Sequence, residues 1–358
     1  MRYRTLGNTG LRVSEIGFGT IPVLSGNVPV LPEYFSPDVQ EAAAIMMHAY
    51  RMGCNFYDTA IPEEYGDAEY KLGVFAEKVG RENIIISDKA RFMDGNDMFR
   101  EVQRSAENLG TNPDIYFVHQ VDENNQDEAF SRYGALDALC DLKKAGVIRY
   151  TGIATHYYSV AARAAADSRV DVIQTSGNIM ERGIMDRIAA DVRFRGKGLI
   201  LNKVYAAGCL LPEFQPSELI GGILHWPFSC ALIGIGTMEQ VDAAMQTEYA
   251  PLHLTFDAVM QRLSESFSPL RCDRCQRCIC PHGYEVHILL RQYHYYHLGK
   301  RFWAMKKLRL NIAEVYAHCR ACTERTCMQT CPQKLRIPEL IEMIYELSRQ
   351  PLPDKKQP

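Results

Sequence analysis

The feature that most constrains the fold is a repeat of short apolar runs, each followed by residues with helical spacing. Eight runs rich in β-branched or apolar residues begin about 20 to 40 residues apart in the first 240 positions. They are 15–19, 54–57, 84–87, 115–118, 150–153, 172–175, 199–202 and 231–235. Eight alternations of strand and helix over about 245 residues predict a (β/α)8 barrel.

The stretch at 38–53 shows the helical pattern clearly. Asp38 is placed to cap a helix, apolar residues then recur at helical spacing, and Gly53 is placed to end it. An open doubly wound sheet is the alternative fold, but the G-x-G-x-x-G turn typical of it is replaced by GFGTIP at 17–22. The barrel is therefore the favoured prediction.

The character of the sequence changes after Thr255. No further strand-like run follows, whereas helical stretches are expected at 285–318 and 338–349. We expect a barrel domain over residues 1–262 and a small α-helical domain over residues 263–358.

Polar side chains stand at the ends of three consecutive predicted strands. Asp58 follows the run 54–57, Lys89 closes the segment IIISDK, and His119 follows IYFV, while Tyr65 lies in the loop after the first of these strands. Chemistry in a barrel of this kind takes place at the carboxyl ends of the strands, so the four side chains are expected to converge.

These four residues form a candidate catalytic set for hydride chemistry. Tyr65 would donate a proton to a carbonyl oxygen, and the cation of Lys89 would lower the phenol's pKa. Asp58 would hold Lys89, and a neutral His119 would orient the substrate oxygen. The alternative is structural: a cap at Asp58, a surface aromatic at Tyr65 and a core histidine at His119.

Several segments, in order, resemble the strand signatures of the aldo-keto reductase family. They are YRTLGNTGLRVSEIGFGT, NFYDTA with YGDAE, IIISDK, DIYFVHQ, GVIRYTGIAT and DVIQTSGN. The resemblance covers about residues 1–245 and implies a barrel that binds NADPH or NADH, with Asp58, Tyr65, Lys89 and His119 as the catalytic tetrad. Tyr65 stands seven residues after Asp58, whereas family members usually place the tyrosine five residues after the aspartate.

The same resemblance implies the residues that bind the cofactor. Thr155 and His156 take the place of a Ser-Asn pair that holds the nicotinamide amide, and Gln174 matches a third contact. The phosphate-binding turn GIGTMEQVDAAM supplies a further set of positions, which are Gly234, Gly236, Thr237 and Gln240. No arginine or lysine lies between Ile233 and Gln246, so the usual partner of a 2′-phosphate is missing. The sequence therefore leaves the choice between NADPH and NADH open.

Eight of the twelve cysteines fall in two runs that both end in Cys-Pro. The first is Cys272-x2-Cys275-x2-Cys278-x-Cys280, and the second is Cys319-x2-Cys322-x4-Cys327-x3-Cys331. Both resemble the bacterial ferredoxin run C-x2-C-x2-C-x3-C-P, in which the fourth cysteine binds the other cluster. By that analogy Cys272, Cys275, Cys278 and Cys331 hold one [4Fe-4S] cluster, and Cys280, Cys319, Cys322 and Cys327 hold the second. Residues 263–358 thus resemble the helical, ferredoxin-like iron–sulfur domain that a minority of aldo-keto reductase relatives carry at the C-terminus. Two zinc sites are the alternative.

Composition limits the remaining possibilities. A net charge of −3 argues against a nucleic-acid partner, and no apolar run approaches the length of a membrane span. The N-terminal residues lack a secretory signal, so a cytoplasmic protein is expected. The sequence predicts an NAD(P)H-dependent oxidoreductase for a small carbonyl or alcohol substrate, with clusters that exchange electrons with a redox protein or stabilise the extension. The alternatives are a catalytically idle barrel serving as a scaffold for an iron–sulfur electron-transfer protein, and a zinc-stapled binding protein.

Overall fold

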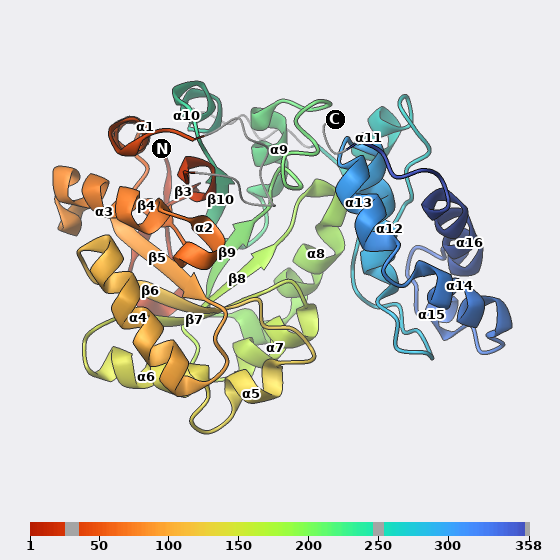
Figure 1. The fold of residues 1–358 in the computed structure, drawn as a ribbon, viewed down its shortest axis with the longest axis horizontal. Coiled ribbons are helices and arrows are strands. Elements are labelled where there is room, and N and C mark those ends of the chain that lie inside the picture. Colours follow the sequence, from red (N-terminus) through yellow and green to blue (C-terminus); the bar gives the residue numbers. More distant parts are fainter. Residues whose placement is uncertain (26–35, 246–253, 355–358) are drawn as a thin grey trace. The chain divides into compact units, whose positions relative to one another are not determined.

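A closed barrel of eight parallel strands is the central feature of the computed structural model, which describes residues 1–25, 36–245 and 254–354 (Figure 1). Its strands are β3 (Ile16–Gly19), β4 (Phe56–Asp58), β5 (Ile85–Ala90), β6 (Ile115–His119), β7 (Tyr150–Thr155), β8 (Val172–Ser176), β9 (Gly198–Asn202) and β10 (Cys230–Gly234). Each strand pairs in parallel with the next, and β10 closes on β3. The predicted barrel is confirmed, and every predicted run overlaps one of its strands.

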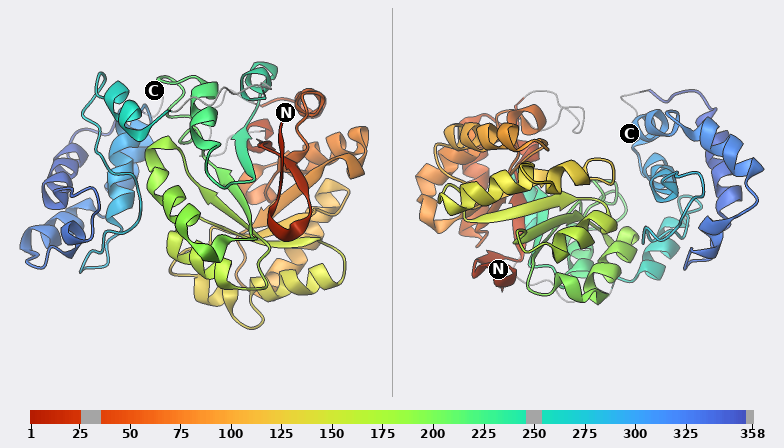
Figure 2. Two further views of the ribbon diagram at one scale, coloured as in Figure 1. Left: turned by 180° about the vertical axis from the view of Figure 1, so that it is seen from behind. Right: turned by 90° about the horizontal axis from the view of Figure 1, so that it is seen from below.

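Helices surround the barrel (Figure 2). The α-helices before residue 245 are α1 (Val39–Arg51), α2 (Pro62–Tyr65), α3 (Ala68–Val79), α4 (Gly95–Leu109), α5 (Gln126–Phe130), α6 (Ala135–Lys144), α7 (Tyr158–Ala166), α8 (Arg182–Ala190), α9 (Pro216–Ile223) and α10 (Met238–Ala244). Helix α1 begins where the sequence predicts. The Asp38 side chain accepts hydrogen bonds from the N–H groups of Gln40 and Glu41, and the Glu41 carboxylate accepts one from the N–H of Asp38. This capping box satisfies N–H groups that the first helical turn would otherwise leave unpaired.

A hairpin at the N-terminus was not predicted from the sequence. Strands β1 (Tyr3–Thr5) and β2 (Arg12–Ser14) pair antiparallel. Leu6, Leu11 and Val13 from this hairpin join the buried cluster that contains barrel residues such as Phe56 and Phe117. Strands of three residues are too short to show an alternating pattern, so the packing of the leucines determines this element.

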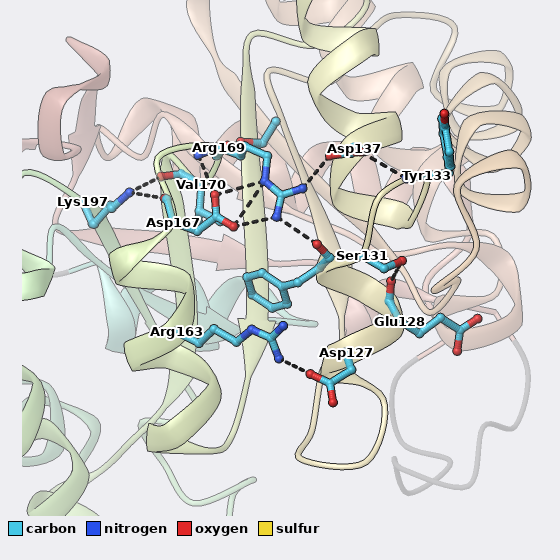
Figure 3. A network of polar contacts seen from close by, with 12 residues as sticks. Asp127, Glu128, Ser131, Tyr133, Asp137, Arg163, Asp167, Arg169, Val170 and Lys197 are labelled. Atoms are coloured by element: carbon cyan, nitrogen blue, oxygen red, sulfur yellow. Dashed lines mark hydrogen bonds and ion pairs between the residues drawn. The ribbon is translucent and has the colours of Figure 1, made fainter.

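A network around Arg169 ties the loop before β8 to two neighbouring helices (Figure 3). Arg169 donates hydrogen bonds to the carboxylates of Asp137 and Asp167 and to the carbonyl of Phe130. Lys197 donates to the carbonyl oxygens of Asp167 at 2.8 Å and Val170 at 2.6 Å. The network satisfies polar groups that are only partly accessible to water.

We expect Arg169→Ala to lower the free energy of unfolding by about 1 to 3 kcal/mol, because it leaves three partly buried acceptors without their donor. Asp127→Asn is the matched control: Asp127 pairs with Arg163, but its side chain is 92% exposed, so a change below about 0.5 kcal/mol is expected. Urea unfolding followed by circular dichroism measures both variants, and equal effects would contradict the role of the network.

By its contacts the chain divides into two compact units. The first comprises Met1–Ser176, Ile188–Val204 and Pro216–Leu252, and the second comprises Gly177–Arg187, Tyr205–Gln215 and His253–Pro358. The loops that follow β8 and β9 therefore belong to the second unit. The predicted domain boundary at residue 262 stays a prediction.

The described part of the second unit after residue 253 is helical. Its helices are α11 (Phe256–Leu263), α12 (Val286–His297), α13 (Arg301–Leu308), α14 (Ile312–Ala321), α15 (Thr326–Gln329) and α16 (Ile337–Ser348). Leu290, Leu308 and Ile344 are fully or almost fully buried in a core of this unit, against which several cysteines pack. No helix in the described ranges is long and apolar enough to cross a membrane.

Candidate active site and cysteine clusters

Lys89 and Asp58 form a buried ion pair at the carboxyl ends of β4 and β5. Nζ of Lys89 lies 2.5 Å from Oδ2 of Asp58 and 2.6 Å from the carbonyl of Thr59. The other carboxylate oxygen of Asp58 accepts hydrogen bonds from Ser87 at 2.7 Å and Gln174 at 3.0 Å. Burial alone would lower the pKa of Lys89, but Asp58 raises it above its usual value, so the ammonium stays charged.

Asp88, the acid that precedes Lys89, makes the stability of the protein depend on pH. Asp88 is fully buried, and one of its oxygens accepts a hydrogen bond from the N–H of Lys89. Burial, and then the neighbouring Glu69, raise the pKa of Asp88 well above its usual value. The folded protein therefore holds this proton more tightly than the unfolded chain does, and it loses stability as the pH rises above about 4.

We expect Asp88→Asn to stabilise the protein by about 1 kcal/mol or more at neutral pH, and by less as the pH falls toward 4. Asparagine keeps the oxygen that accepts from Lys89 and removes the cost of the buried charge. Thermal unfolding across this pH range measures the effect. Asp97→Asn, at a half-exposed carboxylate, is the control, and a stabilisation by Asp88→Asn that did not change with pH would contradict this account.

Tyr65, at the end of α2, lies beside the Lys89 ammonium, whose nitrogen is 4.9 Å from the centre of the phenol ring. The sequence-based expectation was that Lys89 would bring the phenol toward ionisation. Burial instead raises the pKa of Tyr65, and the opposing effect of Lys89 is smaller. The hydroxyl is consequently protonated at neutral pH and acts as a hydrogen-bond donor.

Glu64 is a site residue that the sequence reading did not identify. Its carboxylate lies 2.8 Å from Nδ1 of His119, at the end of β6, and 2.8 Å from Nε of Arg91. Burial lowers the pKa of His119, although Glu64 opposes the shift. Glu64 comes from the segment IPEE, which makes the interval between Asp58 and Tyr65 longer than usual. That longer interval was the feature of the sequence from which an additional site residue could have been predicted.

The residues expected to hold a nicotinamide amide lie at the end of β7 and within β8. The Thr155 hydroxyl donates to the carbonyl of Val121 at 2.6 Å, and His156 lies 3.0 Å from the ammonium of Lys203. Gln174 is buried and bonded to Asp58, which links this group directly to the ion pair. The Thr155 hydroxyl therefore donates its hydrogen bond within the fold, and Gln174 lies beside the candidate catalytic set.

The turn after β10 caps the short helix α10. The Thr237 side chain accepts from the N–H of Gln240 at 3.2 Å, and the Gln240 side chain accepts from the N–H of Gly236 at 2.8 Å. Gly234 ends β10. The N–H of Gly236 therefore already has a partner, and a phosphate at this turn would compete with the Gln240 amide.

Four cysteines from both runs line one cavity of the second unit: Cys272, Cys275, Cys278 and Cys331. Burial raises the pKa of Cys275 to about 12. The backbone N–H groups of Arg274 and Arg277 favour the thiolates of Cys272 and Cys275 and oppose the rise in their pKa values. The structure thus brings the last cysteine of the second run to the first three of the first run.

The other four cysteines, Cys280, Cys319, Cys322 and Cys327, form a second group. Burial raises the pKa of Cys327 to about 11, and the three neighbouring thiols add to the shift. No disulfide joins any of the twelve cysteines. Within the described ranges, no group of three or more His, Cys, Asp or Glu side chains is arranged to hold a single metal ion.

Arg274 lines the first cysteine cavity and is almost completely buried. Its Nη1 donates to Glu181 at 2.5 Å. Among the described residues, its Nε and Nη2 have no hydrogen-bond partner. Arg274 and Gln276 both have a φ near +55°, the left-handed conformation that also occurs in backbone loops that bind anions.

Comparison with known sequences identifies the barrel. The model of the aldo/keto reductase family matches residues 15–220. L-Galactose dehydrogenase of Arabidopsis thaliana is 30% identical over 236 residues, which is 60% of this chain and 70% of that protein. D-threo-Aldose 1-dehydrogenase of a Pseudomonas species is 25% identical over 242 residues, or 58% of this chain and 70% of that protein.

Solved structures agree on the fold. An aldo-keto reductase structure from Pseudomonas aeruginosa is 26% identical, with a TM-score of 0.57, and the match covers 68% of this chain and 93% of that one. The aldo-keto reductase AKR11C1 from Bacillus halodurans matches 77% of this chain and 99% of its own, with a TM-score of 0.60 at 21% identity.

Proposed function

The chain belongs to the aldo/keto reductase family, and from this premise we propose that it transfers hydride between a nicotinamide nucleotide and a small carbonyl or alcohol substrate. The observation that carries the proposal is the buried Lys89–Asp58 pair with Tyr65 beside it at the carboxyl ends of the strands. Two relatives carry the names of sugar dehydrogenases, so an aldose is the first substrate class to test.

The residues near the ion pair fit the amide end of a nicotinamide. Gln174 joins this region to Asp58, and His156 adds a ring nitrogen at the neighbouring strand end. When bound, the nucleotide supplies or accepts the hydride. Gly234, Gly236, Thr237 and Gln240 would hold its phosphates, and the lack of a basic residue beside them leaves the choice between NADH and NADPH to experiment.

Side chains of this protein supply the proton to the substrate oxygen and stabilise the charge that develops there. Tyr65 is protonated at neutral pH and donates from Oη to that oxygen. The Lys89 ammonium stabilises negative charge as it develops on Tyr65 and the substrate, and Asp58 holds Lys89 in position. His119 contacts the same oxygen and orients it.

We further propose that the two cysteine groups hold two [4Fe-4S] clusters. Three observations support this: four thiols line one cavity, backbone N–H groups favour the thiolates of Cys272 and Cys275, and two buried donors of Arg274 suit the sulfides of a negatively charged cluster.

Such clusters would transfer single electrons, and a redox protein would be their partner. Twelve cysteines without a disulfide suit a reducing compartment, so we propose a cytoplasmic protein. A second candidate function, an idle barrel serving as a scaffold for electron transfer, is favoured by the Gly236 N–H and the Thr155 hydroxyl, which are engaged within the fold.

The test between these functions is an assay of the anaerobically purified protein with L-galactose and other aldoses and with NAD+ or NADP+. Formation of reduced nucleotide at 340 nm, dependent on enzyme and sugar, is expected. Failure to bind either nucleotide, by calorimetric titration, would favour the scaffold.

A further inference from the structure

The charges of this protein are distributed unevenly along the chain. Residues 263–358 contain 16 lysines and arginines but only nine aspartates and glutamates, whereas residues 1–262 contain 24 against 34. No acidic residue lies between Glu285 and Glu314, and five cationic residues fall within 300–309. A local surplus of positive charge attracts acidic molecules and raises the rate at which they encounter the protein.

Helix α13 and the residues next to it carry this surplus on an accessible face. The side chains of Ala304, Met305 and Leu308 are buried and form the inner face of the helix. The exposed residues are Arg301, Lys306, Lys307, Arg309 and Leu310. We call residues 300–310 the basic surface.

Neighbouring groups hold cations of the basic surface in place without neutralising them. Nζ of Lys306 lies 5.9 Å from the centre of the Trp303 ring. Nε of Arg309 donates to the backbone carbonyl of Ser348 at 2.9 Å. An aromatic ring or a carbonyl group orients a cation but carries no net charge, so the positive charge stays available to a partner. Side chains that are already oriented also lose less conformational entropy when a partner binds.

Like charges lie close together at this surface. Partial burial lowers the pKa of Lys307, and the cations of Arg291 and Lys300 add to the effect. Their mutual repulsion destabilises the protein when it is alone. A partner that brings carboxylates to the basic surface would relieve this repulsion.

The basic surface lies close to the cysteines of the second unit. Leu308, on the inner face of α13, belongs to the core against which Cys272 and Cys319 pack. Arg291, whose charge acts on Lys307, lines a cavity together with Cys272. A protein that docks on α13 would therefore stand near the proposed clusters.

We propose that the basic surface docks a small acidic electron-transfer protein. This inference rests on the proposed function of the clusters: one electron passes between a cluster and the redox centre of the partner, so that one is reduced as the other is oxidised. Leu310, which is 80% exposed, and the half-exposed Trp303 add the apolar and aromatic contacts typical of protein interfaces. An anionic membrane does not fit, because the apolar face of α13 is buried in the core and cannot enter lipid.

The test measures the binding of a plant-type [2Fe-2S] ferredoxin, an acidic protein, to the anaerobically purified full chain by calorimetric titration. We expect binding at low salt that weakens as the salt concentration rises. In Lys306→Glu/Lys307→Glu the affinity should fall at least about tenfold. The control Arg100→Glu/Lys144→Glu makes the same change in net charge at exposed residues of barrel helices and should lower the affinity less than about threefold. Circular dichroism checks that both variants are folded.

The outcomes separate this inference from the proposed function. Absence of ferredoxin binding at low salt, equal losses in the two double variants, or equally tight binding of the basic protein cytochrome c would overturn the docking surface. So would tighter binding of RNA or of phosphatidylserine vesicles than of ferredoxin. Iron analysis of the same sample tests the clusters independently, because a chain that lacks iron but binds ferredoxin as expected supports the docking surface and refutes the clusters.

Discussion

Replacing Tyr65 with phenylalanine is expected to lower kcat by about 100-fold to 10,000-fold in either direction of the reaction. Phenylalanine keeps the ring beside Lys89 but removes the hydroxyl that donates to the substrate oxygen. The dissociation constant of the nicotinamide nucleotide should change little, because the lost group acts on the substrate. Steady-state kinetics combined with nucleotide titration measures both quantities.

Tyr70→Phe provides the matched control for this experiment. Tyr70 lies on α3, five residues farther along the chain, and is 55% exposed, so its hydroxyl should contribute nothing to turnover. Unaltered turnover in Tyr65→Phe would remove the tyrosine from the catalytic set. An equal loss of nucleotide affinity and turnover would indicate a structural role.

Cysteine substitutions are expected to remove iron in a pattern that depends on which thiols share a cluster. The wild type should contain about eight irons and Cys331→Ser about four. The double variant Cys272→Ser/Cys331→Ser should also retain about four, because both residues line the same cavity. Cys280→Ser/Cys331→Ser should retain almost none, because it removes a ligand from each group. Iron and acid-labile sulfide analysis after anaerobic purification measures these contents.

The outcome distinguishes crossed clusters from sequential ones. If each run held its own cluster, Cys272→Ser/Cys331→Ser would lose both and retain almost no iron. Cys140→Ser, at a half-buried thiol in α6 outside both runs, should leave the iron content unchanged. Stoichiometric zinc without iron in the wild type would contradict both arrangements.

The sequence predicted the barrel because its strands are buried on both faces and read as continuous apolar runs. Phe56, Tyr57 and Ile86 illustrate this: each is completely buried. The N-terminal hairpin escaped prediction because its strands are short and its leucines find their partners only in the closed barrel. Asp38 signalled the start of α1 because capping is a local interaction.

The positions of the candidate catalytic residues could be predicted from the ends of the strands, but the shifts of their pKa values could not. The Lys89–Asp58 contact was expected, whereas the direction in which the pKa of Tyr65 shifts depends on the burial of its hydroxyl, a property of the folded chain. Glu64 was missed for a related reason. Adjacent glutamates in IPEE look alike in the sequence, and only the helical turn directs one to His119 and the other to Arg104.

The central claim is direct hydride transfer at the carboxyl ends of the barrel strands, and isotope transfer tests it most directly. The protein would be incubated with an aldose deuterated at C1 and with the nucleotide that it binds, and the reduced nucleotide would be examined by mass spectrometry. We predict that one deuterium moves from the sugar to the nicotinamide ring in the wild type and not in Tyr65→Phe. Oxidised sugar accompanied by unlabelled nucleotide would contradict direct transfer.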